Sequence, residues 1–193
     1  MSSSGSVKEH DASTTRVLLV RAVNVGGTAR LPMADFRQLL TDVGAESART
    51  YIASGNAVVS LPSAWTAVEW TQFDRAVETE LESRFGFHRD VISRSIDDVQ
   101  ASLAAHPFDI QNPQWSYIAF LASEPKPERL ARAAELSTGT DEWRLLGSDL
   151  HLRYANGMGN ASLKLDALLK RLDTAGTARN LRSVNAILAL ATQ

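Results

Sequence analysis

The segment RTYIASGNAVVSL, residues 49–61, decides the fold class of this chain. It contains two runs rich in β-branched and aromatic residues, 49–53 and 57–61, which are separated by Ser54-Gly55-Asn56. Glycine and asparagine adopt the left-handed backbone of a tight turn at low cost, so the segment predicts a β-hairpin.

The segments on either side of this hairpin complete the order β-α-β-β-α-β. The run Val17-Leu18-Leu19-Val20 is short and apolar, which is typical of a buried strand. Apolar residues three and four positions apart predict one helix over residues 33–43 and another over 66–85. A further strand is expected over residues 88–94. This order is that of the ferredoxin-like fold.

The second part of the chain repeats most of this order after the Asn112-Pro113 pair, which is typical of a boundary. The predicted elements are a strand at 116–121, a helix at 125–136, a hairpin that turns at 147–149 and a helix at 162–172. No closing strand is evident, and residues 177–191 are predicted to form a helix instead.

The chain is therefore predicted to be an α+β protein with two tandem ferredoxin-like halves of βαββα type, the second closed by a C-terminal helix. The predicted parts are a disordered leader at 1–15, a first half at 16–95, a linker helix at 96–113 and a second half at 114–193. The leader is assigned because its Ser-rich sequence has almost nothing to bury.

Composition excludes several classes of function. The 193 residues include no cysteine, so disulfides, thiolate metal sites and a cysteine nucleophile are excluded. The formal net charge of −2 argues against a dedicated binder of double-stranded DNA. No apolar run approaches the roughly 20 residues of a membrane-spanning helix, and no secretory signal is evident. We expect a cytoplasmic protein with no membrane partner.

Four strings of residues resemble, in the same order, the bacterial domain-of-unknown-function family 1697. They are Arg21-Ala22-Val23-Asn24-Val25-Gly26-Gly27, Arg49-Thr50-Tyr51-Ile52-Ala53-Ser54-Gly55-Asn56, Tyr154-Ala155-Asn156-Gly157-Met158-Gly159 and Thr177-Ala178-Arg179-Asn180. The resemblance covers residues 16–190 and implies a tandem α+β fold, with no established activity to carry over. The chain departs from the family pattern at Ala22, usually glycine, at Asn160, usually basic, and at Leu181, usually aromatic.

The loop after the first strand is a candidate anion site. Asn24, Gly26 and Gly27 precede a predicted helix, whose free N–H groups and dipole favour an anion. Arg21 and Arg30 could add positive charge. The alternative is that the two glycines only allow positive φ in a turn. The loop has neither the P-loop sequence nor the three-glycine dinucleotide motif.

A second loop has the same chemistry. Asn156, Gly157 and Gly159 lie between a predicted strand and a predicted helix, with Arg153 and Lys164 on either side. In a split βαβ unit we expect the opening strand and the strand after the hairpin to be parallel neighbours, so each loop should lie at the equivalent end of its own half. Whether the two loops face one another depends on how the halves dock.

Two further pairs complete the candidate ligand-binding residues. Ser54 and Asn56 are first of all turn residues, and Ser54 is not part of a Gly-x-Ser-x-Gly elbow. Arg179 and Asn180 could bind a carboxylate or phosphate through the guanidinium. The equally weighted alternative is that this pair caps a helix or ties the C-terminal segment to the body of the protein.

No metal site or cofactor is predicted. The histidines His10, His88, His106 and His151 are far apart in the sequence and lack the spacing of a zinc site. The acidic pairs 97–98 and 141–142 lie near the starts of predicted elements, and this placement is favoured over a catalytic role. Trp115 and Tyr117 could stack nucleic-acid bases, but core or partner contact is favoured over this role, since no RNP signature is present.

Three classes of function remain open. The first is a binding module for a small anionic ligand, a nucleotide or single-stranded nucleic acid, which uses the two Gly/Asn loops. The second is a structural or protein-interaction protein without a ligand, including a homodimer. The third is an enzyme that acts on a phosphorylated or nucleotide substrate, with Arg21, Arg94 or Arg179 stabilising charge. We rank the enzyme lower because no general base is identifiable.

Overall fold

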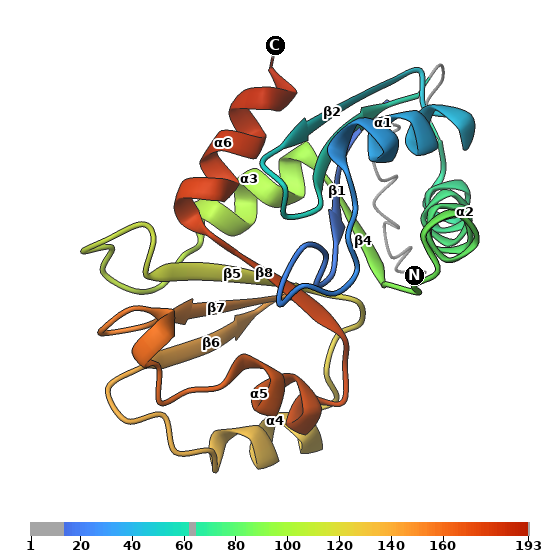
Figure 1. Ribbon diagram of the computed structural model, residues 1–193. Helices are drawn as coiled ribbons and strands as arrows, with labels where there is room; N and C mark the ends of the chain where they lie inside the picture. Colours follow the sequence, from blue (N-terminus) through green and yellow to red (C-terminus); the bar gives the residue numbers. More distant parts are fainter. Residues whose placement is uncertain (1–13, 62–64, 193) are drawn as a thin grey trace, which may run out of the picture.

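The computed structural model describes residues 14–61 and 65–192, which form two α+β halves that follow one another along the chain (Figure 1). Each half contains a four-stranded antiparallel sheet with helices on its outer face. The predicted leader lies outside the described residues, apart from Thr14 and Thr15. Among the described helices, none has the length and apolarity needed to cross a membrane.

The first sheet has the strand order β2-β3-β1-β4, and every neighbouring pair in it is antiparallel. The expected parallel pairing of the opening strand with the strand after the hairpin is therefore wrong, because the tight turn reverses β3 relative to β2 and so sets it antiparallel to β1. The elements of this half are β1 (Thr15–Val20), α1 (Met33–Asp42), β2 (Ser47–Tyr51), β3 (Asn56–Ser60), α2 (Ala67–Phe85) and β4 (Val91–Ser95). The predicted hairpin is therefore present as β2 and β3, with its turn at residues 52–55.

The second sheet has the strand order β6-β7-β5-β8, which is the same arrangement with each strand four numbers later. Helix α3 (Ile96–Ala104) precedes it. The elements of the second half are β5 (Ser116–Leu121), α4 (Pro127–Ala134), β6 (Glu142–Leu146), β7 (Asp149–Arg153), α5 (Leu165–Leu172), β8 (Gly176–Asn180) and α6 (Leu181–Ala191).

The prediction of a helix over all of residues 177–191 is wrong at its start. Residues 176–180 form β8, which pairs with β5, and the helix α6 begins only at Leu181. The strand was missed because its sequence, GTARN, contains no apolar run. Its buried positions are occupied by Gly176, Thr177 and Arg179, and the polar atoms of the last two are satisfied by hydrogen bonds rather than by apolar packing.

Each half has an outer hydrophobic core between its sheet and its own helices. In the first half the core is centred on Phe36, Leu39, Trp70 and Val77, which lie against alternate residues of β1 and β3. In the second half it is built from Ala119, Leu121, Leu150, Leu152, Leu168, Leu169 and Leu172. These cores follow the period-two alternation that an amphipathic strand requires.

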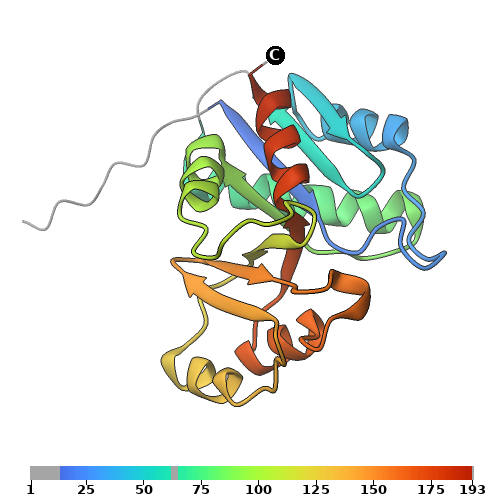
Figure 2. The same ribbon diagram turned by 90° about the vertical axis from the view of Figure 1, so that its left-hand side faces the viewer.

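A third core, which we term the shared core, joins the two halves. It contains apolar residues of β1, β3 and β4 together with Ile118 and Phe120 of β5 and the buried faces of α3 and α6. Helix α6 comes from the end of the chain but lies against β1, β2 and β3 of the first half (Figure 2). The two halves are therefore fixed against one another by apolar burial, and any cleft between them has stable walls.

Candidate functional site

The two halves carry an arginine at the same place in their sheets. Arg94 is the fourth residue of β4 and lies opposite Val17 of β1. Arg179 is the fourth residue of β8 and lies opposite Ile118 of β5. Since the two sheets have the same strand order, both side chains start from equivalent points on the inner face of a sheet.

The residue after each arginine caps the helix that follows. The side chain of Ser95 accepts a hydrogen bond from the Asp98 amide at 3.0 Å, at the start of α3. The side chain of Asn180 accepts one from the Ser183 amide at 2.8 Å, at the start of α6. Asn180 therefore has the capping role that the sequence left open.

Arg179 is buried and binds the first half, and every N–H group of its guanidinium donates a hydrogen bond. Only 8% of the residue is exposed. Its five N–H groups donate to five acceptors: Asn56 Oδ1, Thr177 Oγ1 (2.6 Å), and the carbonyl oxygens of Ala178 (2.9 Å), Ser54 (2.9 Å) and Val20 (3.1 Å). Three of these acceptors belong to the first half. The arginine thus ties the C-terminal segment to the body, as one of the two sequence alternatives proposed.

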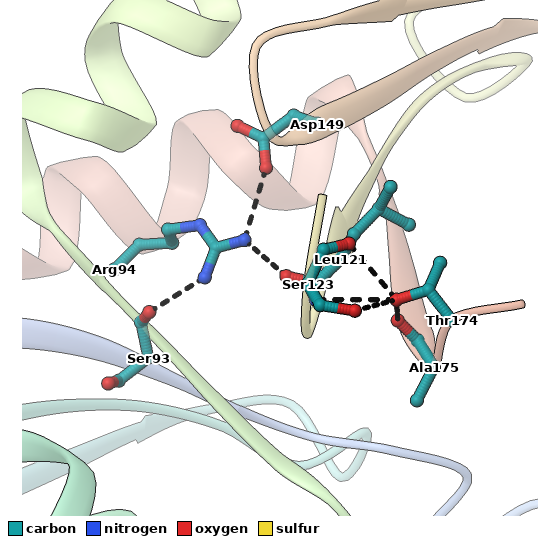
Figure 3. Close-up of polar contacts among 7 residues, drawn as sticks. All are labelled: Ser93, Arg94, Leu121, Ser123, Asp149, Thr174 and Ala175. Carbon is teal, nitrogen blue, oxygen red and sulfur yellow. Dashed lines mark hydrogen bonds and ion pairs between the residues drawn. The ribbon is translucent and has the colours of Figure 1, made fainter. Parts of the chain in front are cut away.

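Arg94 makes the reciprocal contact with the second half (Figure 3). Its Nη2 donates to the Leu121 carbonyl oxygen at 2.6 Å and lies 3.4 Å from Asp149 Oδ1. Leu121 ends β5 as Val20 ends β1, so the two arginines bind equivalent carbonyl groups. Each half is therefore held by an arginine from the other.

One position distinguishes the two contacts. Asn56 begins β3 and lies opposite Leu19, whereas Asp149 begins β7 and lies opposite Phe120. Arg94 thus has a carboxylate beside it, and Arg179 has an amide in the same place. Burial raises the pKa of Asp149, while the charge of Arg94 opposes that rise.

The charge of Arg179 is consequently uncompensated. Among the described residues, no carboxylate oxygen lies within ion-pair distance of it, and all five of its acceptors are neutral. Burial lowers the pKa of Arg179 to about 10, so the guanidinium still carries its charge at neutral pH. A buried positive charge without a counter-ion creates a positive potential in any adjacent cavity.

A cleft of about 500 Å³ opens beside Arg179, between the two halves; we term it the Arg179 cleft. Each of the four strings contributes to its lining. The contributions are Arg21, Ala22, Val23 and Val25 from the first, Ile52 and Ser54 from the second, Met158 from the third and residues 177–180 from the fourth. The structure therefore brings the two predicted loops to one cleft, a point that the sequence left open.

A close approach holds the first two strings together. Gly55 has a φ of +73°, and a Cβ atom added there would lie 2.6 Å from Val23 Cγ2. The Gly55 carbonyl oxygen also accepts a hydrogen bond from the Val20 amide at 2.8 Å. Glycine is therefore required in this turn both for its backbone conformation and for its missing side chain.

Asn24 organises the first loop instead of lining the cleft. Its side-chain amide donates to the carbonyl oxygens of Leu31 (2.8 Å) and Ala53 (2.7 Å), and its Oδ1 accepts from the Leu31 amide (2.8 Å). Gly26 and Gly27 have positive φ in an exposed turn. The loop also ends before α1, whose N-cap is Pro32. The asparagine and glycines therefore match the turn alternative.

The second loop already holds a carboxylate of the protein itself. Asp141 accepts hydrogen bonds from the amides of Ala155 (2.9 Å), Ser162 (2.8 Å) and Leu163 (3.0 Å). Within the candidate loop 156–162, the Ser162 amide is thus bound to a carboxylate of the protein itself, as are the flanking amides of Ala155 and Leu163. The predicted residues of this loop, Asn156, Gly157 and Gly159, do not line the Arg179 cleft. Asn56, which was predicted from the hairpin turn, does not line it either and accepts a hydrogen bond from Arg179 instead.

Two lining residues have strained backbones. Ala22 has a φ of 49° and Ile52 a φ of 46°, in the left-handed region. This conformation costs an L-residue roughly 1–2 kcal/mol, and a β-branched residue such as isoleucine adopts it rarely. At position 22 the family pattern has glycine, which avoids the cost. Backbone strain of this kind concentrates at functional sites.

The rim of the cleft combines apolar and charged groups. Val25, Ile52 and Met158 are exposed by 59%, 54% and 41%, although they come from three different loops. Arg21 also lies on the rim, 3.6 Å from Asp90 and 3.7 Å from Asp166. These ion pairs are long and partly solvated, so Arg21 can exchange them for a ligand at little cost.

The equivalent cleft beside Arg94 has a different charge. This Arg94 cleft has a volume of about 530 Å³, and its lining includes Ser95, Asp98 and Asp149. At the equivalent positions the Arg179 cleft has Asn180 and Ser183 in its lining, and Asn56 bound to the Arg179 side chain. Its positive groups are Arg16 and Arg94. Two carboxylates therefore balance two guanidiniums here.

A buried histidine pair lies at the junction of the halves and was missed from the sequence. The Nδ1 atoms of His106 and His151 are 3.2 Å apart, and His151 is fully buried. Burial, followed by the neighbouring His106, lowers the pKa of His151 to about 4. Spacing gave no signal, since the two residues are 45 positions apart. Within the described residues, no three His, Asp or Glu side chains gather closely enough to hold a metal ion.

Comparison with known proteins gives a family and a fold. A model of the family described as Protein of unknown function (DUF1697) matches residues 13–151. The structure of the conserved bacterial protein SP0830 from Streptococcus pneumoniae is similar, with a TM-score of 0.66 and 20% identity. The match covers 92% of this chain and 98% of that one. At this identity the likeness is evidence of the fold alone.

A second structure matches far less well. It is a protein provisionally assigned as a glycine cleavage system transcriptional repressor, with 14% identity and a TM-score of 0.21. The match covers 86% of this chain and 95% of that one, but such a score supports no argument about fold or function. No curated protein matches the chain.

Proposed function

We propose that this chain, which belongs to the DUF1697 family, is a binding module for a small anionic ligand that occupies the Arg179 cleft. The observation that carries this proposal is the buried, uncompensated charge of Arg179 beneath a cleft that all four strings line. The mode of binding proposed here differs from the one predicted from the sequence. The attraction comes from guanidinium charge between the halves and not from glycine loops at helix N-termini.

The electrostatic argument rests on where the charge lies. Arg179 uses all of its N–H groups within the protein, so it acts on a ligand through its charge and not through direct hydrogen bonds. In a poorly solvated interior a charge is screened less than at the surface, and its field extends further. An anion in the cleft would lower the free energy of the unpaired guanidinium as well as its own.

Arg21 would supply the direct contact. Its side chain is 38% exposed, and both of its carboxylate partners are more than 3.5 Å away. A guanidinium in this position can turn toward a carboxylate or phosphate and bind it through two parallel hydrogen bonds. Arg21 and Arg179 together give the cleft two positive charges against the single carboxylate of Asp166 in the lining.

The Arg94 cleft provides an internal comparison. It lies between the same two halves and has a similar volume, but Asp98 and Asp149 offset its positive groups. We infer that an anion selects the Arg179 cleft for this reason alone. The enzyme alternative stays lower in rank, because the lining of the Arg179 cleft holds no histidine and only the exposed Asp166 as a carboxylate.

For the fold, the proposal retains two ferredoxin-like units over residues 16–95 and 114–193. It is supported by the antiparallel order β2-β3-β1-β4 and its repetition as β6-β7-β5-β8, each with two helices on the outer face. In a split βαβ unit the inserted strand separates two parallel strands in this manner.

Titration with inorganic phosphate and sulfate, followed by thermal shift and calorimetry, tests the proposal. Ligands that bind only the native state raise its stability, so millimolar phosphate should raise Tm. We expect R21Q to weaken phosphate binding about threefold to tenfold, since a charge-assisted contact is lost. The matched control is R37Q, which removes the same charge from α1, outside the cleft. Equal affinities in the two variants, or no shift with either anion, would overturn the proposal.

A further inference from the structure

Three exposed apolar side chains gather on the rim of the Arg179 cleft. Six large apolar side chains are exposed among residues 14–61 and 65–192, and half of them, Val25, Ile52 and Met158, line this one cleft. They come from three loops that are far apart in the sequence. None of the six lines the Arg94 cleft. Single exposed apolar residues are common on proteins, but a group of them around a concave site is typical of a ligand-binding surface.

The hairpin turn that contains Ile52 differs from its counterpart in the second half. β6 and β7 are joined by Gly147 and Ser148 alone, whereas β2 and β3 are joined by the four residues 52–55. Ser54 and Gly55 of the longer turn make contacts within the protein, but Ile52 belongs to none of its three hydrophobic cores. The isoleucine is therefore not needed to reverse the chain or to fill a core.

The conformation of Ile52 is unfavourable for the stability of the ligand-free protein. Its φ of 46° lies in the left-handed region, which β-branched residues adopt rarely, and 54% of the residue is exposed. Asparagine or glycine would adopt the same backbone at lower cost. A strained, exposed apolar residue at the rim of a cleft indicates a role in binding rather than in folding.

The apolar rim adjoins the positive groups of the cleft. Arg21 and Arg179 line the same cavity, and Val23, Leu165 and Ala178 add apolar groups to its lining. The cavity therefore offers positive charge to one end of a ligand and apolar walls to the rest. Its volume of about 500 Å³ is typical of sites for small molecules, which combine apolar walls with a few polar groups.

We propose that the ligand is a small amphipathic anion, whose charged group lies near Arg21 and whose hydrocarbon body covers Val25, Ile52 and Met158. The body is hydrocarbon because the valine and isoleucine side chains make no hydrogen bonds and the Met158 thioether is only a weak acceptor. This inference rests on the proposed function, since it assigns the anionic end of the ligand to the Arg179 cleft.

A series of phosphate monoesters with the same charged group tests the hydrocarbon body. The probes are methyl, n-butyl and phenyl phosphate, measured by calorimetry at one pH and salt concentration. n-Butyl phosphate carries three more methylene groups than methyl phosphate, and each one that leaves water strengthens binding about fourfold. Ordering of the chain offsets part of this gain, so we expect n-butyl phosphate to bind about tenfold more tightly than methyl phosphate. Equal affinities for the three esters would overturn the inference while leaving the anion site in place.

Replacement of Ile52 separates binding from stability. I52N removes the hydrocarbon side chain and supplies a residue that adopts the left-handed backbone readily. We expect it to weaken n-butyl phosphate about fivefold, leave methyl phosphate unchanged and raise the Tm of the ligand-free protein. The matched control V68N makes the same kind of change at an exposed residue of α2, outside both clefts, and should leave both affinities unchanged.

A second variant removes apolar surface from a different loop. M158Q keeps a flexible side chain of similar length but makes it polar, so it should weaken n-butyl phosphate about threefold without affecting methyl phosphate. Unchanged n-butyl phosphate affinity in either I52N or M158Q would contradict the inference. A lower Tm of ligand-free I52N would also contradict it, because Ile52 would then stabilise the fold itself.

The remaining outcomes distinguish this inference from the proposed function. Methyl phosphate binding that R21Q weakens, without any gain from the butyl group, would support the anion site alone and overturn the amphipathic ligand. Self-association of the wild type that I52N abolishes, measured by sedimentation equilibrium, would assign the rim to a second copy of this chain and overturn the inference. Absence of binding by inorganic phosphate and by every ester would overturn both proposals.

Discussion

Arg94 and Arg179 occupy the same position in the two halves of the molecule, yet their surroundings differ in charge. Both donate to the last carbonyl group of a central strand in the other half. Arg94 lies beside the carboxylate of Asp149, and Arg179 beside the amide of Asn56. The geometry of the junction is thus repeated, and its electrostatics are not.

This difference separates what holds the halves together from what could make a site. Hydrogen bonds to buried carbonyl groups hold the halves together in both places. An ion pair is not needed for that purpose, since Arg179 is fully satisfied by neutral acceptors. Leaving one guanidinium unpaired costs stability, because a buried charge without a counter-ion is unfavourable. We infer that the unpaired guanidinium is retained despite this loss of stability because its charge attracts a ligand.

The largest effect should come from removal of Arg179. R179M leaves five acceptors without their donor, three of them in the first half, and should lower the free energy of unfolding by about 3–5 kcal/mol. Urea denaturation followed by circular dichroism measures the change. A loss below about 1 kcal/mol would mean that the neutral contact does not hold the halves together.

The histidine pair extends the comparison to a third equivalent position. His151 lies opposite Ile118 in the second sheet as Val58 lies opposite Val17 in the first. The pKa of His151 falls from an ordinary 6.5 to about 4, so below pH 6.5 the unfolded chain binds the proton and the folded protein does not. The free energy of unfolding should therefore decrease as the pH is lowered from about 6.5 to about 4.

H151V isolates this effect, because its packing cost does not depend on pH. Between pH 7 and 5 the wild type should lose about 2 kcal/mol of stability relative to H151V. Asp74, whose pKa burial raises to about 6, has the opposite dependence but titrates in both proteins. Urea denaturation at the two pH values gives the difference, with H88Q as a control at an exposed histidine. Parallel pH curves for wild type and H151V would contradict the assignment.

Conversion of Asp149 to asparagine should make the Arg94 cleft resemble the Arg179 cleft. D149N keeps a side-chain oxygen for Arg94 but removes the counter-ion, so we expect a loss of about 1–2 kcal/mol of stability. We also expect a second phosphate-binding event, detected as a change from one site to two by calorimetry. A single site in a folded D149N protein would show that charge alone does not distinguish the clefts.

The smallest effect concerns the rim. Asp166 is 92% exposed at its side chain and lies 3.7 Å from Arg21. D166N removes the one carboxylate of the lining and should strengthen phosphate binding about twofold to fivefold, within the range of an exposed ion pair. Calorimetry at low and high salt provides the check. A gain that does not diminish in high salt would exclude an electrostatic origin.

Much of the fold could be predicted from the residues. The short apolar run Val17-Leu18-Leu19-Val20 and the Ser54-Gly55-Asn56 turn predicted strands, and apolar periodicity predicted the helices. The strand β8 could not be predicted, since the buried side chains of GTARN are those of Thr177 and Arg179, and the burial of Arg179 depends on acceptors from the other half. Local patterns contain no information about such distant partners.

The candidate site could be predicted only in part. The cleft is lined by four of the predicted residues, Arg21, Ser54, Arg179 and Asn180. Asn24 instead organises its own loop, and Asn56 accepts a hydrogen bond from Arg179. The signal that could have identified the key difference is the alignment of Ser54-Gly55-Asn56 with Gly147-Ser148-Asp149. That alignment needs the register of both sheets, which sequence spacing does not provide.

The central claim is that the amide of Asn56 leaves Arg179 unpaired and so makes its cleft bind anions. Phosphate titration of N56D by calorimetry tests it most directly, with N112D as a control that makes the same chemical change outside the cleft. We predict that N56D stays folded and binds phosphate about tenfold more weakly than the wild type, a change of about 1.4 kcal/mol, while N112D is unaffected. Unchanged phosphate affinity in folded N56D would contradict the account.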